Sequence, residues 1–174
     1  IFTNHHCGFG SIQSLSSVEH DYLKDGFVSQ TKEQELPVQG LSVKFLKKTV
    51  NVTDRIMAVI DTMSNEVARI QAADSISKVL CDSVGNDDTQ YAEVFPYYNN
   101  NVYYLQVYDV FNDVRLVFTP PSSVGKFGGD TDNWMWPRHT GDFSVFRVYA
   151  SADNKSAEYA AVNKPYKHRY VPEV

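Results

Sequence analysis

Apolar and polar residues alternate in several short stretches of this chain, and each such stretch predicts a strand. Residues 41–46, Leu-Ser-Val-Lys-Phe-Leu, have the period of two that is typical of a half-buried strand. Residues 102–108 and 114–119 are rich in valine, leucine and aromatic residues and are separated by a turn-forming stretch, so we expect them to pair as a hairpin. Residues 143–149 predict a further strand.

The period changes in the middle of the chain to steps of three and four residues. The apolar residues that follow this period are Ile56, Val59, Ile60, Met63, Val67 and Ile70. Their spacing predicts one amphipathic helix that begins near Thr53 as its N-cap and runs at least to Ile70. We expect it to end before Cys81, because residues 85–88, Gly-Asn-Asp-Asp, favour a loop.

The rest of the chain predicts little regular structure. Ile1–Thr3 fits the end of an apolar strand, whereas Gly8–Gly10 and the polar tail from Ser151 predict loops. Short strands with one inserted helix indicate a mainly β fold. A length of 174 residues fits one domain or part of a larger one. The chain begins Ile-Phe-Thr without methionine or signal peptide, so we interpret residues 1–174 as a piece of a longer protein.

Charge and hydropathy narrow the classes of partner. The formal net charge of −5 argues against nucleic acid as a partner, because the chain lacks the excess of basic residues that would bind phosphates. No apolar run approaches the roughly 20 residues that a membrane helix needs. Two cysteines, Cys7 and Cys81, are too few for a disulfide framework. The sequence leaves open whether they pair with each other, pair outside this chain, or remain free.

The first candidate for chemistry is His6, within Thr3-Asn-His-His-Cys-Gly8. A histidine directly after an apolar strand, followed by cysteine and glycine, resembles the signature around the general base of chymotrypsin-like serine peptidases. Imidazole suits that role because its unperturbed pKa lies near neutrality. The alternatives are a pair of surface or structural histidines, or a metal site built from His5, His6 and Cys7, with His20 as a further ligand.

The second candidate is Asp142, which stands at the mouth of the strand expected over residues 143–149. A general-base histidine needs a carboxylate that fixes its tautomer and stabilises the imidazolium. Asp130 and Asp132 are rivals within the preceding loop, but no strand follows them directly. A solvated turn aspartate is the alternative interpretation of Asp142.

The loop before Asp142 contains both tryptophans of the chain, together with Asn133. An amide oxygen beside an aromatic face, as in Asn133 and Trp134, can hold an ammonium group by hydrogen bonding and cation–π attraction. Alternatively, Trp134 and Trp136 plug the end of a barrel.

Several stretches together resemble one family, the bacterial dipeptidyl-peptidases 7 and 11, which are chymotrypsin-like serine exopeptidases with an inserted helical domain. The stretches that carry this resemblance are residues 4–8, 17–23, 113–117, 120–127 and 129–149. The most specific is residues 131–143, Thr-Asp-Asn-Trp-Met-Trp-Pro-Arg-His-Thr-Gly-Asp-Phe. The resemblance is weakest from about Ile56 to Tyr98.

The resemblance implies a role for each candidate residue. His6 becomes the general base, Asp142 its orienter, and Asn133 with Trp134 a clamp on the free N-terminus of a peptide substrate. It also implies part of a trypsin-like double β-barrel, no cofactor or metal, and a periplasmic or secreted location. In chymotrypsin-like enzymes the cysteine after the base histidine usually bridges to the preceding strand. We expect that strand to lie upstream of Ile1, so Cys7 is expected to be unpaired or bridged adventitiously in this chain.

The family's nucleophile lies in a Gly-x-Ser-Gly type motif, and no such motif occurs in this chain. We therefore expect residues 1–174 to be the His/Asp-bearing part of the catalytic domain, inactive without its C-terminal half, and prone to form homo-oligomers through an exposed barrel edge. The alternative function is a non-catalytic β-rich module that binds carbohydrate or peptide through the aromatic loop.

Overall fold

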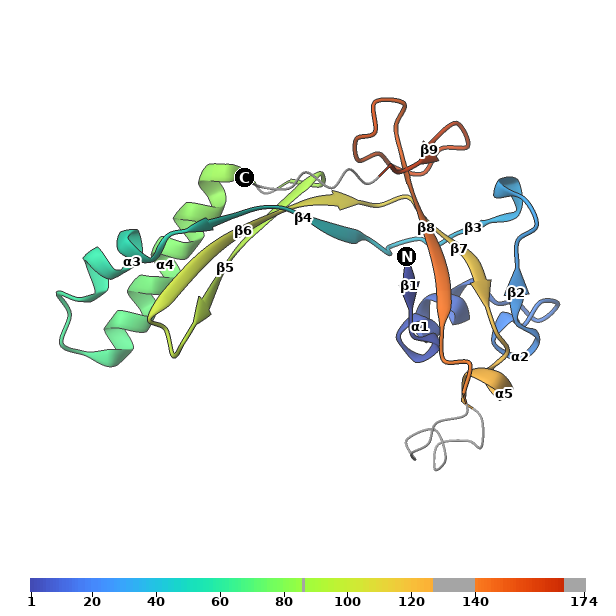
Figure 1. The fold of residues 1–174 in the computed structure, drawn as a ribbon, viewed down its shortest axis with the longest axis horizontal. Helices are drawn as coiled ribbons and strands as arrows, with labels where there is room; N and C mark the ends of the chain where they lie inside the picture. The colour runs from blue at the N-terminus through green and yellow to red at the C-terminus, as the bar shows by residue number, and fades with distance from the viewer. Residues whose placement is uncertain (86, 127–139, 168–174) are drawn as a thin grey trace. The chain divides into compact units, whose positions relative to one another are not determined.

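Two β-sheets, each with its own helices, make up the computed structural model, which describes residues 1–85, 87–126 and 140–167 (Figure 1). The chain divides into two compact units. Unit 1 combines Ile1–Val43 with Phe111–Val174, and unit 2 is the intervening segment Lys44–Val110. The site described below is formed by unit 1.

The sheet of unit 1 is antiparallel and has β8 and β7 at its centre. Its strand order is β1-β8-β7-β2, with β3 also paired to β7 and β9 to β8. The bounds of these strands are β1 Phe2–Thr3, β2 Phe27–Val28, β3 Leu36–Pro37, β7 Val114–Thr119, β8 Ser144–Ala150 and β9 Lys164–Pro165. The helical segments of unit 1 are α1 His5–Leu15, α2 Tyr22–Asp25, the 3₁₀ turn η1 Lys32–Gln34, and α5 Ser122–Gly125.

Helix α1 packs closely on β8. Its buried residues are His5, Gly8 and Ile12, which recur at steps of three and four residues. A Cβ atom on Gly8 would lie 3.4 Å from the Phe146 ring, at van der Waals distance, so the helix and the strand lie close together at this position. This packing stabilises a helix that contains two glycines and that intrinsic propensity alone disfavours.

Unit 2 consists of a three-stranded sheet and two helices. The strands follow the order β4-β6-β5, and β5 and β6 form an antiparallel hairpin. The bounds are β4 Val43–Asn51, α3 Thr53–Ile60, α4 Glu66–Val84, β5 Gln90–Tyr97 and β6 Val102–Phe111. The core buries Val52, Ile56, Ile60, Ala73, Leu80, Ala92, Tyr103, Leu105 and Val107. Within the described part of the chain, no helix is long and apolar enough to cross a bilayer.

The structure corrects the predicted fold class. Of the described residues, 32% are helical and 31% lie in strands, so the fold is mixed rather than mainly β. The predicted loop at Gly8–Gly10 lies inside α1. A trypsin-like double barrel is not confirmed. The prediction was wrong about helix content because the buried stripe of α1 uses histidine and glycine, which give no apolar periodicity.

The helix predicted from Thr53 to Ile70 is two helices. α3 ends at Ile60, and α4 begins at Glu66 with Asn65 as its N-cap, whose side chain accepts from the Ala68 N–H at 3.2 Å. Helix α4 then continues through Cys81 to Val84. Thr53 is the first residue of α3 rather than its cap, and its hydroxyl accepts from the Tyr103 N–H.

The hairpin predicted from residues 102–108 and 114–119 was also wrong. β6 pairs with β5, and β7 pairs with β8 in the other sheet. The turn between β5 and β6 contains Tyr98, Asn99 and Asn100, all with positive φ. Asparagine tolerates this left-handed conformation better than most residues, so the local turn joins β6 to the strand before it.

Candidate active site

The register of the unit 1 sheet brings Asp142 to the first turn of α1. Thr3 of β1 pairs with Ser144 of β8 in an antiparallel ladder. The chain continues from Thr3 through Asn4 into α1, while Asp142 comes just before β8. Residues more than 130 positions apart therefore meet at one end of this strand pair.

His6 and Asp142 are joined by two hydrogen bonds. His6 Nδ1 lies 2.8 Å from Asp142 Oδ2, and the His6 backbone N–H donates to Asp142 Oδ1 at 3.2 Å. An Nδ1–H that donates to a carboxylate leaves Nε2 as the basic nitrogen of the neutral ring. The His6 side chain is 34% exposed and the Asp142 side chain 8%, so the imidazole reaches solvent while the carboxylate is buried.

Asn4 adds a third contact to this carboxylate. Its Nδ2 donates to Asp142 Oδ2 at 3.1 Å, from the N-cap position of α1. Asp142 thus accepts from the side chain at the cap and from the amide at the second helical position, where the helix dipole favours negative charge. Sequence reasoning missed Asn4; an asparagine just before a helix start is the signal that would have pointed to it.

The pKa of the Asp142 carboxyl is held below its usual range. Burial alone would raise this pKa, but the hydrogen bonds from the His6 N–H, from Asn4 and from the His6 ring, with the charge of His6, together outweigh it. The carboxylate is therefore ionised at neutral pH and can hold the neighbouring imidazole in one tautomer.

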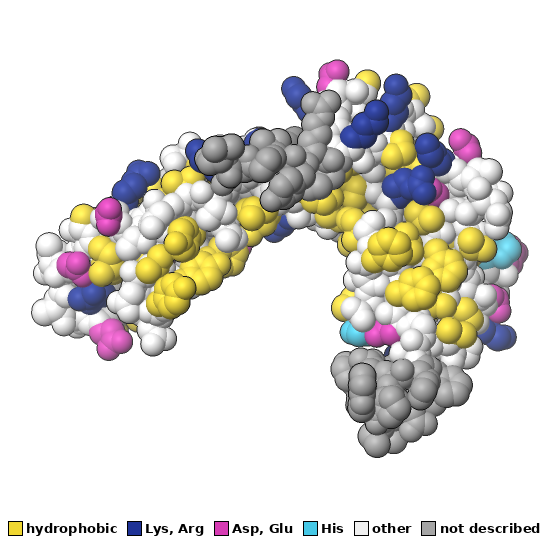
Figure 2. All heavy atoms as spheres, viewed as in Figure 1, with side chains coloured by type: hydrophobic (Ala, Val, Ile, Leu, Met, Phe, Trp, Pro, Cys, Tyr) yellow, Lys and Arg dark blue, Asp and Glu magenta, His cyan; other side chains and the backbone are white. Residues whose placement is uncertain are grey.

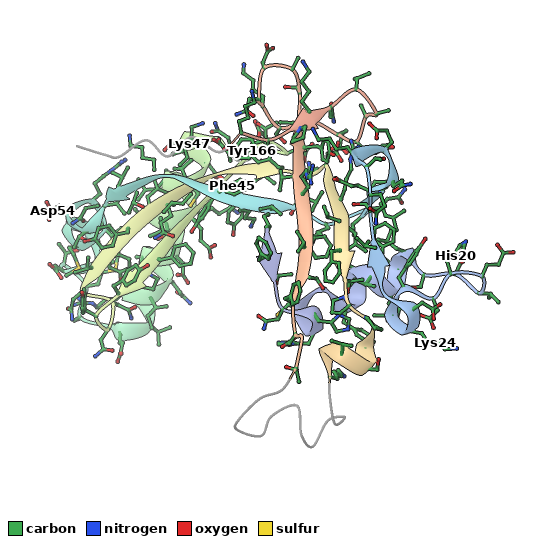
Figure 3. All side chains as sticks on the ribbon, turned by 45° about the vertical axis from the view of Figure 1, so that its right-hand side comes forward. His20, Lys24, Phe45, Lys47, Asp54 and Tyr166 are labelled. Carbon is green, nitrogen blue, oxygen red and sulfur yellow. The ribbon has the colours of Figure 1, made fainter. Side chains whose placement is uncertain are left out.

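The two adjacent histidines have different partners. His5 is completely buried and bonds to the hydroxyls of Thr119 and Ser122. His20 lies on the loop before α2 (Figure 3). Its ring stacks on the ring of Tyr22. The metal interpretation would need these side chains together. In residues 1–85, 87–126 and 140–167 no group of three or more potential ligands is found.

The other predicted site residues lie outside the described part of the chain. These are Asn133 and Trp134, the clamp, and Asp130 and Asp132, the rivals of Asp142. Both cysteines are free, Cys7 on the exposed face of α1 and Cys81 in α4.

The comparisons with known proteins agree on one family. The family model described as peptidase S46 matches residues 1–174. Dipeptidyl-peptidase 7 of Porphyromonas gingivalis is 61% identical over 170 residues, which cover 98% of this chain and 24% of that protein. The Asp/Glu-specific dipeptidyl-peptidase of Flavobacterium psychrophilum is 47% identical and is matched over 95% of this chain and 23% of its own length.

Solved structures show the same relationship. Porphyromonas endodontalis DPP11 in an alternate conformation superimposes with a TM-score of 0.83 at 43% identity, over 95% of this chain and 25% of that one. The complex of that DPP11 with substrate gives a TM-score of 0.82 at 42% identity, with the same coverage. The chain spans about a quarter of the length of the curated relatives it matches.

Proposed function

This chain belongs to the peptidase S46 family, and we propose that it is the His/Asp-bearing part of a serine dipeptidyl-peptidase, which releases dipeptides from the free N-terminus of peptides. The observation that carries the proposal is the hydrogen bond between His6 Nδ1 and Asp142 Oδ2, with 2.8 Å between the two atoms. The family names of the relatives support a peptidase, and they do not favour the alternative of a non-catalytic binding module.

In this proposal His6 is the general base and Asp142 its orienter. His6 Nε2 takes the proton of a serine hydroxyl as the serine oxygen attacks the scissile carbonyl carbon. The imidazolium formed is stabilised by the ionised Asp142. It then gives its proton to the leaving amine as the peptide bond breaks, leaving an acyl-serine. Water hydrolyses the acyl-serine by the same proton route, which frees the dipeptide.

We propose that the nucleophilic serine and the oxyanion hole belong to the full-length protein outside this chain. The chain has no Gly-x-Ser-Gly motif. Catalysis by this mechanism needs nucleophile, base and oxyanion hole in one rigid arrangement. The chain alone is therefore expected to be inactive on dipeptidyl substrates, whereas the full-length protein is active. Turnover that copurifies with the isolated chain would contradict this division.

A row of apolar residues supports the proposal that further chain packs on unit 1. Phe2, Val145, Phe118 and Val28 pair directly across β1, β8, β7 and β2, so their side chains share one face of the sheet. The ring of Phe143 stacks on the ring of Phe118, with the two ring centroids 5.2 Å apart. Hydrophobic side chains gather over β8 and β7 in Figure 2, and Phe2 is 79% exposed. A face of this kind favours burial against another part of the protein.

The substrate clamp is proposed for Asn133 and Trp134, on the resemblance to the family. An exopeptidase must recognise the substrate ammonium, and an amide beside an indole can do so. The relatives include both dipeptidyl-peptidases 7 and Asp/Glu-specific dipeptidyl-peptidases, so the proposal covers peptides without assigning the side chain at the second position.

The test is an assay of the full-length protein on chromogenic dipeptidyl substrates with acidic and with hydrophobic second residues. We expect cleavage of at least one substrate, inactivation by a serine-directed reagent, and no cleavage of the same substrate with an acetylated N-terminus. Equal cleavage of free and acetylated substrates would remove the clamp and the exopeptidase assignment. Full activity after complete labelling by the serine reagent would remove the serine mechanism.

Two further parts of the proposal concern the protein's surroundings. We propose a periplasmic or cell-surface location, which cell fractionation tests. We also propose self-association, supported by Val67, Ile70 and Val79 on α4, which are each at least half exposed. A clean monomer in sedimentation at high concentration would contradict it.

A further inference from the structure

His5, the residue before the proposed base, is held by two hydroxyl groups inside unit 1. Its Nδ1 lies 3.0 Å from Thr119 Oγ1 and its Nε2 lies 3.3 Å from Ser122 Oγ. Its exposed fraction is 0%. Both ring nitrogens therefore have protein partners, and the ring has no access to a substrate.

The Thr119 hydroxyl connects His5 to the strand that follows Asp142. Thr119 is the last residue of β7, and its Oγ1 accepts from Ser144 Oγ at 3.2 Å. Ser144 is the first residue of β8, is fully buried, and lies two positions after Asp142. The first turn of α1 is thus attached to the start of β8 twice, through His6 to Asp142 and through His5 and Thr119 to Ser144.

This chain of hydrogen bonds is complete with a neutral His5. Thr119 Oγ1 also donates to the Pro120 carbonyl at 3.3 Å, which leaves its lone pairs for Ser144 and for an Nδ1–H of His5. Burial lowers the pKa of His5, and the charges of Lys126 and His6 act in the same direction, against the opposing effect of Asp142. The neutral ring therefore adds no charge beside the proposed catalytic pair.

Packing fixes the orientation of the His5 ring. A Cβ atom on Gly125 would lie 2.5 Å from His5 Cδ2, so the backbone of α5 rests directly against the imidazole. The Phe9 ring stands edge-on to it, with ring centroids 6.4 Å apart. A ring held by two hydrogen bonds and by this backbone cannot turn without moving α1 or β7.

We infer that His5 is a positioning residue that fixes the first turn of α1 against β7 and β8, so that His6 Nδ1 meets Asp142. The inference rests on the proposed function. If the His5–Thr119–Ser144 connection is lost, α1 keeps its apolar packing through Ile12 and Phe146 but its first turn is free to shift. A displacement of about 1 Å at a catalytic group can cost roughly 100-fold in rate.

The experiment measures kcat and KM of the full-length protein on the dipeptidyl substrate that it cleaves best. His5→Phe keeps a planar aromatic ring, slightly larger than the imidazole, and removes both hydrogen bonds. His5→Asn retains an N–H in place of Nδ1 and can keep the bond to Thr119. His20→Phe is the matched control, because His20 is exposed and stacks only on Tyr22 among the described residues.

We expect His5→Phe to lower kcat by about 100-fold with KM within about twofold. His5→Asn should recover at least about tenfold of that loss, and His20→Phe should match the wild type. Unchanged kcat in His5→Phe would overturn the inference, and so would a His5→Asn variant that folds but is as slow as His5→Phe.

Thr119→Val gives a second test if His5→Phe does not fold. It keeps the side-chain shape and removes the hydroxyl that links His5 to Ser144, so kcat should fall while KM stays unchanged. Where His5→Phe does fold, the losses of the two variants should not add in the double variant, because both substitutions break one connection. Full additivity, or a Thr119→Val variant with wild-type kcat, would overturn the inference.

A parallel His6→Ala variant separates this inference from the proposed function. If His6→Ala keeps wild-type turnover, the proposed function fails. If His6→Ala abolishes turnover while His5→Phe and Thr119→Val leave kcat unchanged, only the positioning role of His5 fails.

Discussion

The Asp142 carboxylate accepts two hydrogen bonds from His6, which lies 136 positions away in the sequence. The ring nitrogen Nδ1 lies 2.8 Å from Oδ2, and the backbone nitrogen lies 3.2 Å from Oδ1. One carboxylate therefore orients the imidazole and stabilises the start of the helix that carries it. The proposed catalytic pair and the N-terminus of α1 are in this way a single structural feature, and a change in Asp142 should affect both activity and stability.

The first prediction concerns acid stability. The pKa of Asp142 is depressed in the folded protein, where burial opposes the charge and hydrogen bonds from His6 and Asn4 outweigh it. The unfolded chain takes up this proton first as pH falls. The stability that Asp142 contributes is thus present above about pH 4 and is lost as pH falls through the folded value. Asp142→Asn should show a smaller loss of melting temperature between about pH 6 and pH 3 than the wild type.

The matched control is Asp153→Asn, since Asp153 is exposed. It should follow the wild-type pH dependence. Parallel curves for Asp142→Asn and the wild type would show that Asp142 makes no ionisation-linked contribution to stability.

The second prediction compares two ion pairs of similar length and different burial. Arg115 Nη2 lies 2.7 Å from Asp113 Oδ2 with both side chains buried, whereas Lys47 and Asp109 meet at 2.8 Å on the surface. Arg115 also lies over the Tyr149 ring at 3.8 Å. Asp113→Ala leaves a buried guanidinium uncompensated and should lower the free energy of unfolding by about 3–5 kcal/mol.

Asp109→Ala is the control and should cost at most about 1 kcal/mol. Urea denaturation of both variants, followed by circular dichroism, measures the difference. An equal loss in the free energy of unfolding for the two substitutions would mean that burial does not determine how much these ion pairs contribute to stability.

The third prediction concerns alkaline stability. Burial, then the hydrogen bond to Glu35 and the charge of Glu35, raise the pKa of Tyr149 to about 12. The neutral phenol is favoured by the fold, so its contribution is complete below the unfolded pKa of about 10 and is lost as pH rises toward about 12. Tyr149→Phe should flatten this alkaline decline in melting temperature.

Tyr98→Phe is the matched control, because Tyr98 is 77% exposed in the turn between β5 and β6. Its alkaline decline should equal that of the wild type. An undiminished decline in Tyr149→Phe would place the titrating group elsewhere.

The fourth prediction concerns the thiols. Both cysteines are free, Cys7 is exposed, and burial raises the pKa of the Cys81 thiol. Because the thiolate is the reactive form, native labelling with iodoacetamide should modify Cys7 before Cys81. Peptide mass spectrometry measures the order. Under denaturing conditions without reductant both should be labelled, and resistance of both to labelling would reveal a disulfide.

The predicted contact between His6 and Asp142, which was based on short sequence motifs, is found in the structure. His6 and Asp142 were selected from a strand–histidine–cysteine pattern and from an aspartate before a strand, and the structure places them in contact. The resemblance to dipeptidyl-peptidases 7 and 11 is confirmed by the family model and by the relatives. Residue type and position relative to an element nominated these two residues, and the resemblance to the family supplied the roles expected of them.

The elements that depend on tertiary packing were not predictable in the same way. The buried stripe of α1 consists of His5, Gly8 and Ile12, and its stability depends on the approach to Phe146. In α4 the apolar Val79 is 66% exposed, whereas its neighbour Leu80 is 2% exposed. Apolar residues of this helix therefore lie on both its buried and its exposed face, and their spacing does not mark where the helix begins and ends. Which residues of a helix are buried depends on the surfaces that pack together in the folded protein, and the spacing of apolar residues along the chain does not predict this.

The most direct test of the central claim is the turnover number of Asp142→Asn in the full-length protein. The substitution keeps the shape of the side chain and removes the charge that fixes the His6 tautomer. The account predicts that kcat on a dipeptidyl substrate falls by about four orders of magnitude, while Asp153→Asn stays at the wild-type value. An Asp142→Asn variant that retains wild-type kcat would contradict the claim that His6 and Asp142 form the catalytic pair.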